Sequence, residues 1–222
     1  MSPRSRGSGG GQALGVMGGT FDPIHVGHLA IAEEAREALS LDRILFVPAG
    51  LPPHKPAGSV TGVEHRVAMV RLAIADNPAF ELDTIEVDRP GPSYTVDTVE
   101  ALARRSAGTR VTMILSAETF AELPSWHEPE RLFEAARVAV VPREGYPAPD
   151  PAWLAATFPG REGRVDYLEG PRLGLSSTAI RARVAAGRSI RYLVPPVVAT
   201  YIADHHLYQP GSSAGERRTT ST

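Results

Sequence analysis

The chain has 222 residues, of which 42% are hydrophobic and 22% are charged, and its formal net charge is −2. This length fits one α/β domain with a hydrophobic core, and the composition is that of a globular protein. The slightly acidic balance argues against a general nucleic-acid binder, which usually carries a basic excess. The lack of cysteine excludes disulfides, thiolate-bound metals and a cysteine nucleophile.

No apolar run approaches the about 20 residues that cross a bilayer, and residues 1–12 lack the apolar core of a signal peptide. We therefore expect a soluble protein without a membrane anchor and, by default, a cytoplasmic location. Residues 1–12 and 209–222 are polar and lack apolar periodicity, which is typical of flexible tails. We expect one folded domain over residues 13–208, and the sequence leaves room for a homo-oligomer.

Short apolar runs alternate with helical patterns along this domain. The expected pairs of strand and helix are 13–18 with 29–39, 43–47 with 64–75, and 80–82 with 95–105. Further strands are expected at 110–115, 138–141 and 165–168, and closing helices at 177–186 and 195–203. Pro and Gly cluster in residues 48–62 and 142–163, which predicts irregular loops. The alternation predicts an α/β fold with a mainly parallel sheet, helices on both faces, and ligands beyond the carboxyl ends of the strands.

The segment after the first expected strand reads Gly-Gly-Thr-Phe-Asp-Pro-Ile-His-Val-Gly-His-Leu over residues 18–29. It connects the strand to a helical pattern. Its glycines lack the Cβ atoms that would obstruct a phosphate, and the amides at the start of the next helix favour an anion. The segment is neither a Walker loop nor a dinucleotide fingerprint, because it contains neither Gly-Lys nor Gly-x-Gly-x-x-Gly.

His25 and His28 lie on either side of Gly27, which places both imidazoles on one side of a helix start. Two donors that face the same volume could hold one phosphate chain. A zinc site would need a third protein ligand, no cysteine is available, and Asp22 lies on the wrong side of Pro23. We therefore interpret the two histidines as phosphate ligands.

A second candidate anion site lies far along the chain, in Leu175-Ser-Ser-Thr-Ala-Ile-Arg181. Ser176, Ser177 and Thr178 are typical N-cap residues, and Arg181 follows one turn into the expected helix. Amides, hydroxyls and guanidinium would then point outward together. Taken alone, the motif would fit an ordinary helix cap with a solvated arginine better.

Lys55, in Leu51-Pro-Pro-His-Lys-Pro56, is the only lysine, since every other basic residue is an arginine. It lies in the first expected loop. Coding bias that spared one lysine and a functional requirement for that lysine both explain the contrast.

The pairing of Gly-Thr-Phe-Asp-Pro-x-His-x-Gly-His near the N-terminus with Ser-Ser-Thr-x-x-Arg near the C-terminus resembles the nucleotidylyltransferase superfamily. Three further segments narrow the resemblance: Pro48-Ala-Gly-Leu-Pro-Pro-His-Lys55, Ser93-Tyr-Thr-Val-Asp-Thr98 and Leu123-Pro-Ser-Trp126. Over nearly all of residues 13–208 the chain is similar to bacterial nicotinate mononucleotide adenylyltransferases. The resemblance implies a Rossmann-like, doubly wound fold that transfers AMP from ATP to nicotinate mononucleotide, with Mg²⁺, giving nicotinate adenine dinucleotide and pyrophosphate.

The resemblance also implies two groups of site residues. Those expected at the ATP are Gly18, Gly19, Thr20, Phe21, His25, His28, Ser177, Thr178 and Arg181, and the expected catalytic residues are His25, His28 and Arg181. Those expected at the nicotinate mononucleotide are Lys55, Tyr94, Thr95, Glu118, Trp126 and Arg143. Trp126 would stack on the pyridine ring, amides near Thr95 would receive its carboxylate, and Arg143 would contact a phosphate. Without the other motifs, Trp126 would be read as a half-buried surface aromatic.

One position departs from the family. The family usually has a Gly-Ala-Asp-like segment after the strand expected at 110–115, whereas this chain has Ser116-Ala117-Glu118. Glu118 keeps the negative charge but is one methylene longer, so the resemblance does not fix the nucleotide contact at this position.

The implied reaction needs no nucleophile from the protein, because the phosphate of the incoming nucleotide is already ionised at neutral pH. Mg²⁺, held mainly by the ATP phosphates, would act with His25, His28, Lys55 and Arg181 to offset the repulsion between two anionic chains. We expect His28 to make the closer contact to the reacting phosphates, His25 to support it, and neither to be a general base.

Alternative functions remain open. Another adenylyltransferase would use nicotinamide mononucleotide or phosphopantetheine, although phosphopantetheine enzymes resemble this chain only at the first motif and generally have Thr in place of His25. The choice of acid over amide leaves no trace in the sequence if backbone amides bind the carboxylate. A non-catalytic nucleotide sensor would keep the pocket, but the intact His25, His28 and Arg181 argue against it. A nucleic-acid binding module would have to overcome the acidic balance.

Overall fold

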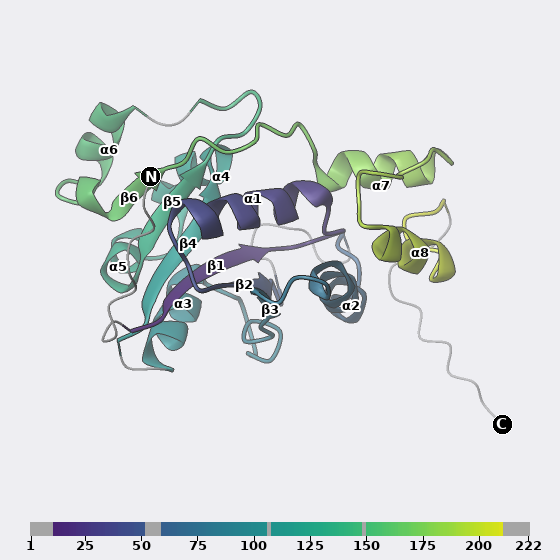
Figure 1. Cartoon of the computed structure of the whole chain (residues 1–222), viewed down its shortest axis with the longest axis horizontal. Helices are drawn as coiled ribbons and strands as arrows, with labels where there is room; N and C mark the ends of the chain where they lie inside the picture. Colours follow the sequence, from purple (N-terminus) through teal and green to yellow (C-terminus); the bar gives the residue numbers. More distant parts are fainter. Residues whose placement is uncertain (1–10, 52–58, 106–107, 148–149, 211–222) are drawn as a thin grey trace, which may run out of the picture.

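The computed structural model describes residues 11–51, 59–105, 108–147 and 150–210 (Figure 1). Six strands form one sheet in the order β3-β2-β1-β4-β5-β6, and every neighbouring pair is parallel. The strands are β1 (Ala13–Gly19), β2 (Arg43–Pro48), β3 (Phe80–Leu82), β4 (Arg110–Ser116), β5 (Arg137–Val141) and β6 (Val165–Tyr167). The strand order reverses between β1 and β4, so the sheet is doubly wound, and ligands of such sheets bind outside the carboxyl ends of the strands at this switch point.

Helices cover both faces of the sheet, as the alternation predicts. They are α1 (Val26–Ala38), α2 (Val63–Ile74), α3 (Thr95–Arg104), α4 (Ala117–Ala121), α5 (Pro129–Ala135), α6 (Pro151–Thr157), α7 (Ser177–Ala185) and α8 (Pro196–Asp204), with the 3-10 turns η1 (Leu123–Ser125) and η2 (Glu162–Arg164). Residues of α1, α2, α7 and α8 share one apolar cluster, and residues of α3, α4, α5 and α6 share another. The predicted parallel sheet between two helical layers is therefore confirmed.

Strand β2 shows how one strand serves both layers. Ile44 and Phe46 enter the cluster with α1 and α2, whereas Leu45 and Val47 enter the cluster with α3. Successive side chains of a strand point to opposite faces, so a buried strand needs an unbroken apolar run. The run at residues 43–47 meets that requirement and explains why it was recognisable in the sequence.

The predicted irregular loop at 142–163 is wrong in part, because it contains α6. Proline is well tolerated at the first helical position, where the missing N–H would have no partner. Pro151 occupies that position, and the Asp150 carboxylate accepts a hydrogen bond from the Ala152 N–H at 2.8 Å. The short elements α4, η1 and α5 were also absent from the prediction, and α1 begins earlier than predicted, at Val26.

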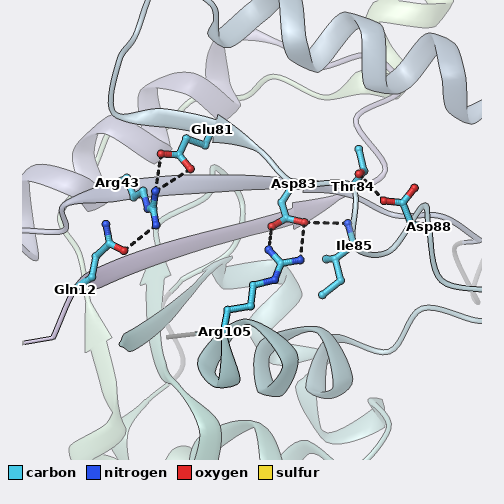
Figure 2. Close-up of polar contacts among 8 residues, drawn as sticks. All are labelled: Gln12, Arg43, Glu81, Asp83, Thr84, Ile85, Asp88 and Arg105. Atoms are coloured by element: carbon cyan, nitrogen blue, oxygen red, sulfur yellow. Dashed lines mark hydrogen bonds and ion pairs between the residues drawn. The ribbon is translucent and has the colours of Figure 1, made fainter. Parts of the chain in front are cut away.

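Arg43, the first residue of β2, links its strand to the strands on either side (Figure 2). Its guanidinium donates to the Glu81 carboxylate at 2.8 Å and to the Gln12 side-chain oxygen at 2.7 Å. Gln12 precedes β1 and Glu81 lies in β3, so one side chain ties together three neighbouring parts of the sheet.

Asp83 holds the start of the segment that leads from β3 to α3 (Figure 2). Its carboxylate accepts hydrogen bonds from Arg105, the C-cap of α3, and from the Ile85 N–H at 2.9 Å. Thr84 closes the next turn by donating to the Asp88 carboxylate at 2.7 Å. The path from β3 to the start of α3 is therefore fixed by polar contacts.

The predicted tails fall mostly on residues 1–10 and 211–222, which lie outside the described residues, as does Lys55. Gln12, at the end of the first predicted tail, accepts a hydrogen bond from the Arg110 N–H at 2.8 Å. In the described parts of the chain, no helix is both long enough and apolar enough to cross a membrane.

Candidate functional site

The turn between β1 and α1 lies at the carboxyl edge of the sheet, where the strand order reverses. Gly18 is exposed and Gly19 is half-buried, so the backbone at the end of β1 is open to a ligand. Phe21 has a φ of 50°, in the left-handed region that is strained for a large side chain. Such strain is kept where the surrounding structure fixes it, and it is common at ligand-binding turns.

The Phe21 ring lies beneath this turn with 2% exposure. It packs edge-on against the His28 ring, with centroids 5.1 Å apart. A Cβ atom on Gly19 would lie only 3.2 Å from the Phe21 ring, so glycine allows the turn to close over it. The ring therefore supports His28, and because it is buried the predicted contact of Phe21 with ATP is left to its backbone.

The imidazoles of His25, the N-cap of α1, and His28 are stacked, with centroids 3.7 Å and planes 20° apart. His28 Nδ1 accepts a hydrogen bond from the His25 backbone N–H at 3.2 Å, so the neutral His28 ring carries its proton on Nε2. His25 Nδ1 is buried, without a hydrogen-bond partner among the described residues. A Cβ atom on Gly27 would lie 3.0 Å from that nitrogen, so the glycine leaves room for the ring. The predicted placement of both rings on one side of the helix start is confirmed.

Both imidazoles are neutral at pH 7 in the free protein. Burial, assisted by the charge of Arg143, lowers the pKa of His25 from 6.5 to about 4. Burial also holds the pKa of His28 well below 6.5, and His25 and Arg143 add to this effect. A phosphate beside the rings would oppose the influence of Arg143 and attract the proton on His28 Nε2.

The second predicted anion motif packs directly against this turn, and Figure 1 shows the start of α7 beside the start of α1. Ser176 caps α7 with its side chain. Ser177 Oγ donates to the Pro23 carbonyl at 2.9 Å, and Arg181 Nη1 donates to the Asp22 carbonyl at 2.7 Å. These partners are 154 and 159 positions apart in the sequence. The fold thus brings together the two motifs assigned to one ATP.

Ser177 and Arg181 do not simply point outward, and that part of the prediction is wrong. The carbonyls of the turn between β1 and α1 need donors, and these two side chains supply them. Arg181 Nη2 also donates to Thr178 Oγ1 at 3.4 Å. A guanidinium has five N–H groups, so Arg181 retains donors for an anion beside the turn.

The Asp22 carboxylate is buried below the same turn, with 2% exposure of the residue. Its Oδ1 accepts a hydrogen bond from the Tyr208 hydroxyl at 2.7 Å, and its Oδ2 accepts one from the Thr61 N–H at 3.2 Å. Burial and the Asp22 carboxylate raise the pKa of Tyr208, so its hydroxyl stays a donor. Sequence reasoning missed Tyr208, because nothing in its neighbourhood marks it as a partner of a residue near the N-terminus.

Glu118 and Arg143 form an ion pair across the ends of β4 and β5, with Arg143 Nε 2.9 Å from Glu118 Oε2. The Tyr146 hydroxyl also hydrogen-bonds to Glu118, which raises the pKa of the tyrosine. Glu118 lies in the first turn of α4, directly after β4. Its predicted contact with nicotinate mononucleotide would have to compete with these partners.

A cavity of about 640 Å³ opens beside Arg143. It is lined by residues 142–147, 168–170 and Arg172. Its volume is within the range of small-molecule sites. The chain runs from Arg172 on the cavity wall to Ser176 at the cap of α7, so the two lie four positions apart along the chain.

The predicted pyridine nucleotide side lies at the start of α3, where Tyr94 is the N-cap and Thr95 the first helical residue. The first amides of a helix have no partner within the helix and can bind a carboxylate. The Tyr94 ring packs on the His127 ring, with centroids 4.3 Å apart, and Trp126 precedes His127. Trp126 is half-buried against the apolar cluster below. Tyr94, Thr95 and Trp126 thus gather near one place, and the predicted member Lys55 lies outside the described residues.

His127 was not predicted as part of this site. The signal that could have found it was its position directly after Trp126, the aromatic residue assigned to the pyridine ring. Its imidazole lies 3.3 Å from the Glu128 carboxylate and against the face of Tyr94. It therefore belongs to the aromatic wall at the start of α3.

Comparison with known proteins agrees with this geometry. The family model described as cytidylyltransferase-like matches residues 16–183, which include both phosphate motifs. A Roseiflexus sp. protein named "Probable nicotinate-nucleotide adenylyltransferase" is 52% identical over 196 residues, which cover 88% of this chain and 98% of that relative. A protein of the same name from Symbiobacterium thermophilum is 45% identical over 204 residues, covering 91% and 98% of the two chains.

The same architecture occurs in a solved structure. Plasmodium falciparum nicotinic acid mononucleotide adenylyltransferase complexed with NaAD aligns with a TM-score of 0.75 at 20% identity, over 89% of this chain and 97% of that one. At this identity the likeness concerns the fold alone. From the family model and the close relatives, the chain belongs to the cytidylyltransferase-like family, among its nicotinate-nucleotide adenylyltransferases.

Proposed function

We propose that this protein transfers AMP from ATP to nicotinate mononucleotide, forming nicotinate adenine dinucleotide and pyrophosphate in NAD biosynthesis. The observation that carries the proposal is the contact between the turn before α1 and the start of α7, at the carboxyl end of β1. Two imidazoles, two helix starts and one guanidinium gather there, which suits a polyphosphate. A relative with 52% identity carries the name of this activity.

In the proposed reaction the protein positions two phosphate groups and supplies no nucleophile. An ionised phosphate oxygen of nicotinate mononucleotide attacks the α-phosphorus of ATP, a new P–O bond forms, and the bond to pyrophosphate breaks. His28 donates from Nε2 to the phosphate chain, and His25 stacks on it and supports it. Arg181 offsets the charge that gathers on the departing pyrophosphate.

Mg²⁺ is part of the proposal and would be held mainly by the ATP phosphates. Among the residues that the structure describes, no group of three or more His, Asp or Glu is placed to hold a metal ion. The Asp22 carboxylate accepts a hydrogen bond from Tyr208, and the Glu118 carboxylate pairs with Arg143. Bound in this way, Mg²⁺ would neutralise phosphate charge while the residues of the turn orient the chain.

The adenosine of ATP is assigned to the cavity beside Arg143. Its volume of about 640 Å³ accommodates a nucleoside. A phosphate chain that starts there would have to run beside residues 172–176 to meet the start of α7. The pyridine nucleotide then enters from the side of α3, with its ring on Trp126 and its carboxylate at the amides near Thr95.

The experiment that tests the proposal is a pyrophosphate-release assay with ATP and Mg²⁺. Nicotinate mononucleotide, nicotinamide mononucleotide and phosphopantetheine are supplied in parallel reactions, and product formation is verified by mass. We expect the highest kcat/KM with nicotinate mononucleotide. Equal rates with the acid and the amide would rule out strict acid specificity, and ATP binding without turnover of any acceptor would indicate a nucleotide sensor. DNA and RNA are expected not to bind, which a salt titration with labelled oligonucleotides checks.

A further inference from the structure

Arg66 of α2 is a buried cation that joins three separate segments of backbone. It is 2% exposed. Its Nη1 donates to the Thr20 carbonyl at 2.9 Å, its Nη2 to the Gly50 carbonyl at 3.2 Å, and its Nε to the Thr61 carbonyl at 3.0 Å. Thr20 belongs to the phosphate turn, Gly50 follows β2, and Thr61 precedes α2.

The three contacts need the shape of a guanidinium. Its planar fork directs N–H groups toward several acceptors at once, whereas an ammonium is a compact charge on a flexible stem. Burial lowers the pKa of Arg66, and the nearby Asp22 charge opposes that shift. A buried cation is costly unless it is paired and hydrogen-bonded, so the three carbonyls explain how this one is kept.

Gly50, which accepts a hydrogen bond from Arg66, is also in contact with the segment that leads to α3. A Cβ atom on Gly50 would lie 2.3 Å from the Glu86 carbonyl oxygen and 3.4 Å from Ser93 Oγ, so Gly50 packs closely against the Glu86 backbone and the Ser93 side chain. The Glu86 carboxylate accepts a hydrogen bond from Thr98 Oγ1, in α3, at 2.9 Å. We therefore expect a shift of Gly50 to displace the segment that ends at Tyr94, the N-cap of α3.

We propose that Arg66 is a positioning residue for the joining of the two nucleotides: by holding Thr20 and Gly50, it sets the distance between the phosphate turn and the start of α3. This inference rests on the proposed function, which assigns ATP to the turn and nicotinate mononucleotide to α3. The binding of either nucleotide alone does not depend on the distance between the phosphate turn and the start of α3. In-line attack depends on it, because a misplacement of about 1 Å can cost on the order of 100-fold in rate.

The first test compares Arg66→Lys with Arg71→Lys, a substitution at an exposed arginine of the same helix. Measurements are kcat and both KM values by pyrophosphate release, Kd for ATP alone and for nicotinate mononucleotide alone, and thermal unfolding. For R66K we expect a folded protein whose two Kd values change by less than about 3-fold, while kcat falls on the order of 10- to 100-fold. R71K is expected to match the wild type.

A second variant changes the distance between the phosphate turn and the start of α3 without changing Arg66. Gly50→Ala places a Cβ atom against the Glu86 carbonyl and leaves Arg66 intact. We expect G50A to lower kcat without a matching rise in either Kd. The double variant should lose less than the product of the two single effects, because both changes disturb one distance.

The outcomes separate the two proposals. Wild-type turnover in R66K, or a rise in both Kd values as large as the fall in kcat, overturns the positioning role. If R66K does not unfold cooperatively, the kcat and Kd values of G50A test the positioning role instead. If neither variant folds, the contacts of Arg66 are purely structural and the inference is wrong. A wild-type protein that forms no dinucleotide overturns the proposed function, and the inference with it.

Discussion

Arg143 and Glu118 form an ion pair across the carboxyl ends of the neighbouring strands β4 and β5, with Arg143 Nε 2.9 Å from Glu118 Oε2. We therefore expect Glu118 to act on a nucleotide through Arg143. We expect Arg143→Ala to raise the KM for a nucleotide substrate about 10-fold, because a charge-assisted hydrogen bond is lost. Glu118→Gln should have a smaller effect, and the double variant should be no worse than R143A. Steady-state kinetics of the three variants measure this coupling.

Glu122→Gln is the control for that cycle, since Glu122 is an exposed carboxylate next to α4. It should leave both KM values unchanged. Independent, additive effects of E118Q and R143A would show instead that Glu118 contacts the nucleotide by itself.

His28→Ala should lower kcat on the order of 100-fold or more, the usual cost of losing one donor to the charge that develops in the transition state. His28 Nε2 is the expected donor because Nδ1 is occupied by the His25 N–H. His25→Ala should lower kcat less, since His25 is the supporting ring. The exposed His206 provides a control in His206→Ala. Near-native turnover of a folded H28A protein would contradict the role of His28.

Stability should fall as the pH is lowered from about 6.5 to about 4. In this window the unfolded chain protonates His25, whereas burial keeps the pKa of the folded residue at about 4. The unfolded state thus binds the extra proton, and the contribution of His25 lost over the window is up to about 3 kcal/mol. His25→Gln should show a shallower decline, measured by urea unfolding between pH 7 and pH 4.5. Parallel curves for the wild type and H25Q would contradict this assignment.

Trp126→Ala should raise the KM for nicotinate mononucleotide about 10-fold and leave the KM for ATP unchanged, because stacking of an aromatic side chain on a base contributes about 1–3 kcal/mol. Trp126→Phe keeps an aromatic face and should restore most of the affinity. Thermal unfolding of both variants is needed, since Trp126 also packs on the apolar cluster below. An equal rise for both substrates would place Trp126 in a structural role only.

Tyr208→Phe should lower the free energy of unfolding by about 1–3 kcal/mol, because the buried Asp22 carboxylate loses the donor at 2.7 Å. Urea unfolding near neutral pH measures the change. Tyr192→Phe is the matched control, because Tyr192 is 83% exposed and should tolerate the loss of its hydroxyl. Equal stability of the two variants would mean that water or another donor replaces Tyr208.

The sheet and the phosphate turn could be predicted because their signals are local. Buried parallel strands need apolar runs such as residues 43–47, and the spacing of His25 and His28 places two rings on one side of a helix start. Helix α6 was missed because its proline content suggested a loop. Pro151 stands at the one helical position where proline is favourable, and only the capping contact of Asp150 reveals this.

The contacts that support the site could not be predicted, because they join distant segments. Arg66 sits in a helical pattern and resembles any solvated arginine of an amphipathic helix until Thr20 and Gly50 are placed beside it. Tyr208 is likewise one tyrosine near the end of the chain until the fold brings it to Asp22. Burial and hydrogen bonding between remote positions depend on the packed structure and leave no periodic signal.

The bond between Tyr208 and Asp22 spans 186 positions, which has a consequence for synthesis on the ribosome. The residues of the phosphate turn emerge first, whereas Ser177, Arg181 and Tyr208, which satisfy its carbonyls and its carboxylate, emerge last. All six strands precede them in the chain, so the nascent sheet can assemble while the nucleotide cradle is still incomplete. We therefore expect a polypeptide that is released before Ser177 to carry the recognisable N-terminal motif but to lack the three side chains that hold the turn in place.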